Sequence, residues 1–143
     1  MTIHLIKLAA GAQKFADIAD KLTKFTVSDS EFGSIVPVFT RNTPKQKDGL
    51  LAGGSLYWVA KGRVIARSPF VDVRAQTDGE GRAYCELCIL PELIRVQPVP
   101  KRAFQGWRYL PVADAPDDIV IDGDQGDDVP EDMLKELQEL GLL

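Results

Sequence analysis

Apolar positions recur along this chain at two different spacings, one helical and one alternating. Between residues 15 and 25 they fall three or four apart, which predicts one long amphipathic helix. The apolar stripe of that helix consists of Phe15, Ile18, Ala19, Leu22 and Phe25. Elsewhere apolar and polar residues alternate, or apolar runs are short, which favours strands. The expected strands cover residues 2–8, 35–40, 55–60, 63–67, 70–75, 82–90 and 107–110.

The clearest of these patterns is a hairpin between residues 53 and 73. Lys61 and Gly62 supply its turn, because glycine accepts the positive φ that a tight hairpin requires. Alternation places Leu56 and Trp58 on one face, which we expect to be the core. The opposite face should then carry four candidate ligand contacts, which are Ser55, Tyr57, Arg63 and Arg67.

Together these elements predict the α+β class. We expect one domain over residues 1–112, built as a small mixed, mostly antiparallel barrel of five or six strands with the long helix packed on it. Composition changes after residue 112, where acidic residues replace apolar ones. We therefore predict an acidic linker over residues 113–129. Pro130 followed by two acidic residues then favours a C-terminal helix over residues 130–143.

Charge is divided unevenly between these segments. Residues 1–112 hold 16 Lys and Arg against 10 Asp and Glu, a net +6, whereas residues 113–143 hold 1 against 11, a net −10. A basic domain with an acidic tail favours a nucleic-acid or other anionic ligand. A tail that only keeps the protein soluble would give the same division.

The location of the protein follows from what the sequence lacks. There is no run of 18 apolar residues, and Lys7 interrupts the first apolar stretch. We therefore expect no membrane span, no secretory signal and a cytoplasmic protein. Two cysteines are too few for a disulfide framework, which agrees with a reducing compartment.

Three motifs invite a catalytic or metal-binding interpretation and do not support it. Cys85 and Cys88 are three apart, so on a strand they point to opposite faces and cannot share a metal. His4 lies alone in a strand, without a defined nucleophile partner. The acidic residues after Asp122 lack the glycine and glutamate of a calcium-binding loop. We accordingly predict no metal site, no cofactor and buried structural cysteines.

The remaining candidates are basic, amide and aromatic side chains from several segments. Arginine contacts phosphates, aromatic rings stack on bases, and amides bind base edges, so this mixture suits RNA or a nucleotide. We expect Trp107 to be the better stacking residue and Trp58 to join the core. The complete set of predicted ligand contacts is Arg41, Asn42, Ser55, Tyr57, Arg63, Arg67, Gln105, Trp107 and Arg108.

Three stretches resemble an uncharacterised alphaproteobacterial family, domain of unknown function 1489. They are MTIHLIKL, LLAGGSLYWVAKGRVIARSPFVDV and FQGWRYLPVADAP. The resemblance covers about residues 1–118 and leaves the acidic tail as an individual extension. It implies no activity.

A more distant likeness concerns about 40 residues. The Arg41-Asn42-Thr43-Pro44 sequence, followed by Gly53, Leu56-Tyr57-Trp58 and the Gly62 turn, is similar to PUA-like domains of the EVE and ASCH type. Those domains are small mixed barrels that bind RNA or modified bases. The likeness implies a pocket lined by Arg41 and Asn42, with Ser55 and Tyr57 or Trp58 beside them. Here Gly54-Ser55 and Ala66 depart from the residues usual in those domains.

We therefore expect a non-catalytic PUA-like module that binds RNA or a modified nucleotide. One alternative is a small-molecule hydrolase acting on a nucleoside or amide, with Lys45, Lys61, Ser55 or Thr40 as base or nucleophile. Another is an interaction module whose C-terminal helix contacts a partner protein or a second copy in a homodimer.

Overall fold

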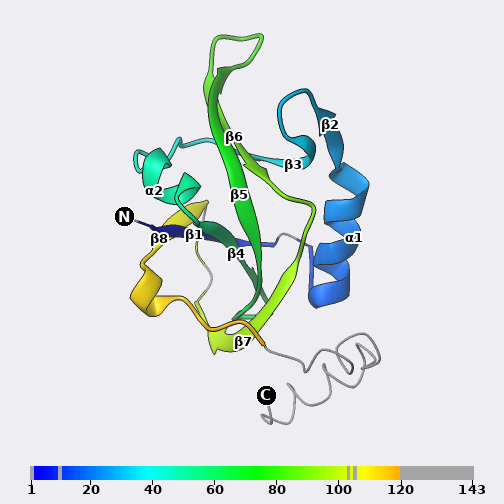
Figure 1. Cartoon of the computed structure of the whole chain (residues 1–143), viewed down its shortest axis with the longest axis vertical. Helices are drawn as coiled ribbons and strands as arrows, with labels where there is room; N and C mark the ends of the chain where they lie inside the picture. The colour runs from blue at the N-terminus through cyan, green and yellow to red at the C-terminus, as the bar shows by residue number, and fades with distance from the viewer. Residues whose placement is uncertain (1, 10, 103, 105, 120–143) are drawn as a thin grey trace.

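The structure, a computed structural model, describes residues 2–9, 11–102, 104 and 106–119. It contains a strongly bent sheet, a long helix α1 on one side and a short helix α2 near the chain start (Figure 1). The strands are β1 (His4–Leu8), β2 (Val27–Asp29), β3 (Gly33–Thr40), β4 (Ser55–Ala60), β5 (Arg63–Thr77), β6 (Ala83–Ile89), β7 (Ile94–Pro100) and β8 (Trp107–Leu110). The helices are α1 (Phe15–Phe25), α2 (Lys47–Leu51) and a short 3-10 helix, η1 (Val112–Asp114).

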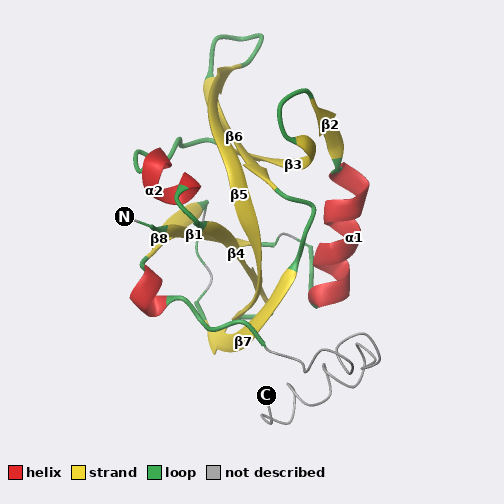
Figure 2. Ribbon diagram, viewed as in Figure 1, coloured by secondary structure: helices red, strands yellow, loops and turns green. Residues whose placement is uncertain are grey.

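The strands form one mixed, mostly antiparallel sheet in the order β2-β3-β6-β5-β4-β1-β8, with β7 also paired to β5 (Figure 2). Only β1 and β4 run parallel. This confirms the α+β class and the mixed character of the sheet. The sheet has eight strands in the described residues instead of five or six, because the segments of β2 and β7 were expected as loop and unpaired extended chain. The strand pairs do not close it into a ring.

Strand β5 connects the two halves of the sheet. Its first half pairs with β4 on one edge and β7 on the other, and its second half pairs with β6. Its length of 15 residues lets it belong to both halves. Because the sheet bends along this strand, β1 and β3 both lie near α1, although they are far apart in the sheet order.

Two hydrophobic clusters cover the two faces of the sheet. The larger cluster contains Leu5, Leu56, Trp58 and Leu87 and packs beneath α1, whose Ile18 and Leu22 belong to it. The smaller cluster includes Ile6, Tyr57, Val59 and Val96 on the other face. Both clusters draw on β4, and all six residues of β4 are buried.

Helix α1 forms where the helical spacing predicted it. Asp17 stabilises its first turn, because its carboxylate accepts hydrogen bonds from the backbone N–H groups of Gln13 (2.9 Å) and Lys14 (3.2 Å). Ile18 and Leu22 are buried, whereas Phe25 at the end of the stripe is 53% exposed. The helix therefore covers the sheet with its middle and leaves its last turn open.

One irregularity in the hairpin changes which side chains share a face. The pairing of β4 with β5 is regular from Ser55 to Trp58 and then shifts, so that Ala60 pairs with Arg63. A bulge of this kind inserts one residue and moves the next side chains to the opposite face. Arg63 consequently lies on the Trp58 face and Arg67 on the Tyr57 face. The expectation that both arginines share one face was wrong.

The strand pairing accommodates two prolines. Pro37 lies in the part of β3 that pairs with β6, whereas β2 pairs only with Gly33–Ile35, so one edge of β3 carries no described strand at Pro37. Proline is tolerated at such an edge, where no neighbouring strand needs its missing N–H. Pro69 is followed by a register shift in the pairing of β5 with β6, between Phe70 and Asp72.

The first residues of the acidic segment lie against the sheet. The Gln97 N–H donates to the Asp117 carbonyl at 2.8 Å, and the Ile119 N–H donates to the Arg95 carbonyl at 2.9 Å. Residues 117–119 thus extend the sheet beside β7. The rest of the predicted linker and the predicted C-terminal helix, residues 120–143, lie outside the described residues. None of the helices described is long and apolar enough to cross a membrane.

Candidate functional site

On the sheet face beneath α1, the charged side chain of Lys7 lies in a cross-strand row between two tryptophans. Lys7 of β1 pairs with Trp58 of β4 on one side and with Trp107 of β8 on the other. Paired residues on neighbouring strands point to the same face of a sheet. Lys7 is only partly exposed, so much of its side chain lies among apolar groups.

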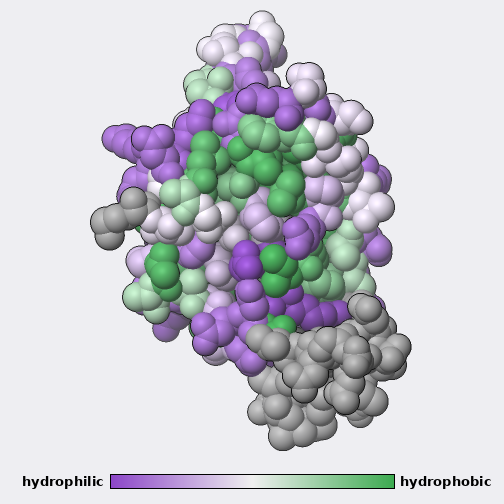
Figure 3. Space-filling model, viewed as in Figure 1, coloured by the Kyte–Doolittle hydropathy of each residue, from purple (hydrophilic) through white to green (hydrophobic). Residues whose placement is uncertain are grey.

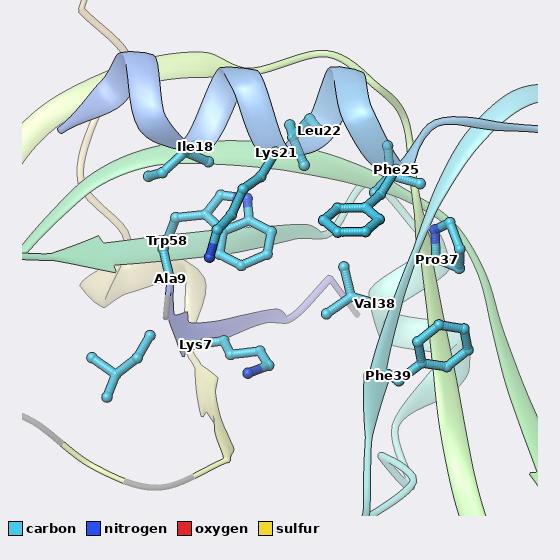
Figure 4. A pocket seen from close by; sticks show the side chains of 12 residues that line it. Lys7, Ala9, Ile18, Lys21, Leu22, Phe25, Pro37, Val38, Phe39 and Trp58 are labelled. Carbon is cyan, nitrogen blue, oxygen red and sulfur yellow. The ribbon is translucent and has the colours of Figure 1, made fainter. Parts of the chain in front are cut away.

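A pocket of about 180 Å³ lies between this row and α1. Four elements line it, which are the end of β1, β4, β3 and α1 (Figure 4). We call it the helix pocket, and its lining consists of Lys7, Leu8, Ala9, Ile18, Lys21, Leu22, Phe25, Val36, Pro37, Val38, Phe39 and Trp58. Pockets for drug-sized ligands hold about 300–1,000 Å³. The helix pocket therefore suits a single ring or base.

Trp58 forms an aromatic wall of the helix pocket. Its indole N–H donates to the buried Ser68 hydroxyl at 3.2 Å, which fixes the ring orientation. In Figure 4 the ring lies beneath α1, with the Lys21 side chain extending across it and the Phe25 ring to one side. Because the ring is already oriented, a planar ligand would not have to order it on binding.

Two lysines give the helix pocket its charge. Lys7 comes from β1 and Lys21 from α1, and none of the twelve lining residues is acidic. Burial, and secondarily the positive charge of Lys21, lower the pKa of Lys7. The pocket therefore combines an apolar interior with two neighbouring cations, an arrangement that favours an anion.

The opposite face of the sheet holds a polar cluster around Arg67. Its guanidinium donates to both carboxylate oxygens of Asp118, at 2.7 and 2.8 Å, and to the Ser55 hydroxyl at 2.9 Å. These hydrogen bonds from Arg67 lower the pKa of Asp118. The acidic segment thus supplies the partner of one predicted ligand contact.

The predicted contacts Ser55 and Tyr57 belong to this cluster but are buried, at 1% and 4% exposure. The alternation assigned them to the correct face, but β7 and residues 117–119 cover that face. A ligand could not reach them without displacing this cover.

His4 and Ser55 do not form a nucleophile and base pair. The His4 Nδ1 accepts the backbone N–H of Ser55 at 2.9 Å, and the Ser55 hydroxyl accepts from Arg67. Burial, followed by the charge of Arg67, lowers the pKa of His4. His4 is the hydrogen-bonded strand histidine that the sequence predicted.

Arg41 and Asn42 follow β3 and contact different elements. The Asn42 carbonyl accepts the indole N–H of Trp107 at 2.8 Å, and the Arg41 guanidinium donates to the Ala83 carbonyl at 3.2 Å. Arg41 also borders a shallow depression that includes Phe39 and Tyr84. Figure 3 shows hydrophobic side chains gathered over β3, β5 and β6, with hydrophilic ones around them.

The last predicted contacts are distributed over the molecule. Arg63 is exposed near the hairpin turn, and the Arg108 guanidinium lies 5.5 Å from the centre of the Phe104 ring. Arg108 shares a cross-strand row with Ile6, Tyr57 and Arg67, on the face opposite Lys7. Gln105 lies outside the described residues. The structure thus brings Ser55, Tyr57 and Arg67 together and places Arg108 two strands away in the same cross-strand row. It joins Asn42 to Trp107 by a hydrogen bond and leaves Arg41 and Arg63 apart from both groups.

The cysteines occupy opposite faces of β6, as predicted. Cys85 belongs to the larger hydrophobic cluster and Cys88 does not, and both are buried and free. Burial raises the pKa of the Cys85 thiol and raises that of Cys88 to about 12. In the described part of the chain no three His, Cys, Asp or Glu side chains are placed to hold a metal ion.

Sequence reasoning missed the helix pocket. Lys7 was considered only as the residue that interrupts the first apolar stretch, and Lys21 lies outside the predicted apolar stripe of the helix. A weak signal was present, because Lys7 occupies the face of its strand that Leu5 gives to the core. A lysine on a core-facing position is a reason to look for a pocket.

The chain belongs to the family described as Protein of unknown function (DUF1489), whose model matches residues 5–143. The match continues through the acidic tail, so the interpretation of that tail as an individual extension was wrong. No curated protein and no solved structure matches the chain.

Proposed function

We propose that this protein is a non-catalytic, PUA-like module that binds RNA or a modified nucleotide, and that the helix pocket receives the base. The observation that carries the proposal is an oriented tryptophan, Trp58, in one pocket with two lysines and no lining carboxylate. Aromatic rings bind bases by stacking, and lysines attract the phosphates attached to them.

The arrangement of the sheet supports the PUA-like part of the proposal. Strands β1 and β3, far apart in the sheet order, line the same pocket, and α1 lies across the space between them. A small PUA-like barrel would also curl its sheet in this way, which supports that part of the proposal.

Tryptophan fluorescence tests the proposal directly. We would titrate the full chain with nucleotides, modified nucleotides and a short single-stranded RNA at low salt. Stacking on Trp58 should quench its emission, and the apparent affinity for RNA should fall as salt rises. The Trp58→Phe variant should lose the quench, because the fluorophore that contacts the base is gone, whereas its phenyl ring can still stack.

The second tryptophan separates this site from the one expected from the sequence. Trp107 does not line the helix pocket, so Trp107→Phe should retain the quench. Circular dichroism would verify that both variants are folded. If none of the ligands binds at low salt, or if only Trp107→Phe abolishes the response, the proposed site is wrong.

A further inference from the structure

We infer that the helix pocket recognises a phosphate monoester, held between the amino groups of Lys7 and Lys21. This inference rests on the proposed function and specifies the ligand of the same pocket. The phosphate would belong to a nucleoside monophosphate or to the phosphorylated end of a strand, because both carry the same doubly charged group.

The fold brings both lysines into the lining of one pocket. Lys7 is near the end of β1, and the chain then turns through Gly11 into α1. Lys21 reaches from α1 back to this turn, since a Cβ built on Gly11 would lie 3.5 Å from the Lys21 Nζ. Figure 4 shows both side chains extending into the region below α1.

Electrostatics favour an anion between these lysines. Two like charges near an apolar surface repel each other, and an anion placed between them changes the repulsion into two attractions. The lowered pKa of Lys7 agrees with this repulsion, which adds to the larger effect of burial.

The number of cations distinguishes a monoester from a diester. A phosphate monoester carries a charge of about −1.5 to −2 at pH 7, because its second pKa is about 6. A phosphodiester inside a strand carries a single negative charge. Two lysines in the lining of one small, mostly apolar pocket therefore match the charge of the monoester, while the ring of the ligand contacts Trp58.

The test compares ligands that carry a terminal phosphate monoester with ligands that lack it. Calorimetric titrations of the full chain would use a nucleoside, its 5′-monophosphate, the corresponding dinucleoside phosphate and a 5′-phosphorylated dinucleotide. Hydrogen bonds to charged groups contribute about 1.5–3 kcal/mol, so the two monoesters should bind roughly 10- to 100-fold tighter than the other two ligands. If only the free mononucleotide does so, the source is a free nucleotide and not a strand end.

Variants connect this preference to the two lysines. Lys7→Gln and Lys21→Gln should each weaken binding of the monophosphate by about tenfold or more and leave nucleoside binding unchanged. Arg82→Gln removes one positive charge at the distant β5–β6 turn and should behave as the wild type. Lys21 is exposed, so its replacement should not disturb folding.

The pH dependence gives an independent readout. Affinity for the monophosphate should increase as pH rises through about 6, where the second phosphate proton is lost. It should decrease again at alkaline pH as Lys7 loses its proton.

Two results would overturn the inference in different ways. Equal affinity for the nucleoside and its monophosphate, or no effect of either lysine variant, would refute the phosphate inference and leave the proposed base pocket intact. Absence of binding by all four ligands would refute the proposed function together with it.

Discussion

Replacing Asp118 by asparagine should destabilise the protein through the loss of one ion pair. In the native structure Asp118 accepts two hydrogen bonds from the Arg67 guanidinium, at 2.7 and 2.8 Å. The asparagine retains the shape of the carboxylate but has no charge and only one oxygen. Arg67 would keep its hydrogen bond to the Ser55 hydroxyl and lose its ion pair with residue 118.

The size of the effect depends on exposure. A hydrogen-bonded charged pair contributes about 1.5–3 kcal/mol when water is excluded, and a fully exposed pair contributes about 0.2–1 kcal/mol. The Arg67 side chain is 22% exposed and that of Asp118 is 40% exposed. Solvent therefore screens the pair considerably, and we expect the free energy of unfolding to fall by about 1 kcal/mol.

The same pair predicts a defined pH dependence. Hydrogen bonds from Arg67 lower the pKa of Asp118 in the folded state, whereas an unfolded aspartate titrates near about 3.9. The stabilisation is therefore complete above the unfolded pKa and is lost as pH falls through the lower folded pKa. The difference between wild type and Asp118→Asn should be constant above about pH 5 and shrink in more acidic solution.

Urea denaturation of both proteins at a series of pH values measures this difference. Asp117→Asn is the matched control, since it removes the same charge from the neighbouring residue without removing the ion pair. Equal stability of wild type and Asp118→Asn at pH 7 would contradict the reasoning. So would a difference that stays constant from neutral pH to well below the unfolded pKa, because the carboxylate would then not be its cause.

Three further predictions concern the folded core. Gly54→Ala should lower the free energy of unfolding by about 3 kcal/mol or more, or prevent folding, because the added Cβ would approach the Ile3 carbonyl oxygen too closely. Its control, Gly79→Ala, has open space around the added Cβ and should leave the thermal denaturation midpoint unchanged. Leu56→Ala should reduce the free energy of unfolding by about 2–5 kcal/mol in urea titrations, since Leu56 is fully buried. Cys85 and Cys88 should resist a thiol reagent at pH 7 in the native state and react in denaturant; rapid native labelling would contradict their burial and raised pKa values.

The sequence predictions were accurate for features that depend on residues close together in the chain, and less accurate for features that depend on distant residues. The helix from Phe15 to Phe25, the Lys61-Gly62 turn and the opposite orientations of Cys85 and Cys88 depend on neighbouring residues, and all three were predicted. Strand β2 was missed because it has only three residues and two of them are polar. Strand β7 was missed because its prolines suggested unpaired extended chain.

The candidate site was predicted less well, because it depends on long-range pairing. Trp58 was assigned to the core from alternation, and it is 7% exposed. The two cations that share its pocket, Lys7 and Lys21, are 51 and 37 positions away in the sequence. Only the parallel pairing of β1 with β4 and the path of α1 bring them together.

The sequence by itself determined the class of fold, the principal helix and the faces of the regular strands β4 and β6, because local periodicity specifies each of these. The tertiary structure decided which faces remain accessible. Alternation gave Ser55 and Tyr57 a common face, but the pairing of β7 with β5 and of residues 117–119 with β7 buried it. The bulge after Trp58 moved Arg63 away from Arg67. The curl of the sheet formed the helix pocket on the other face, because it brought β1, β3 and α1 to one place.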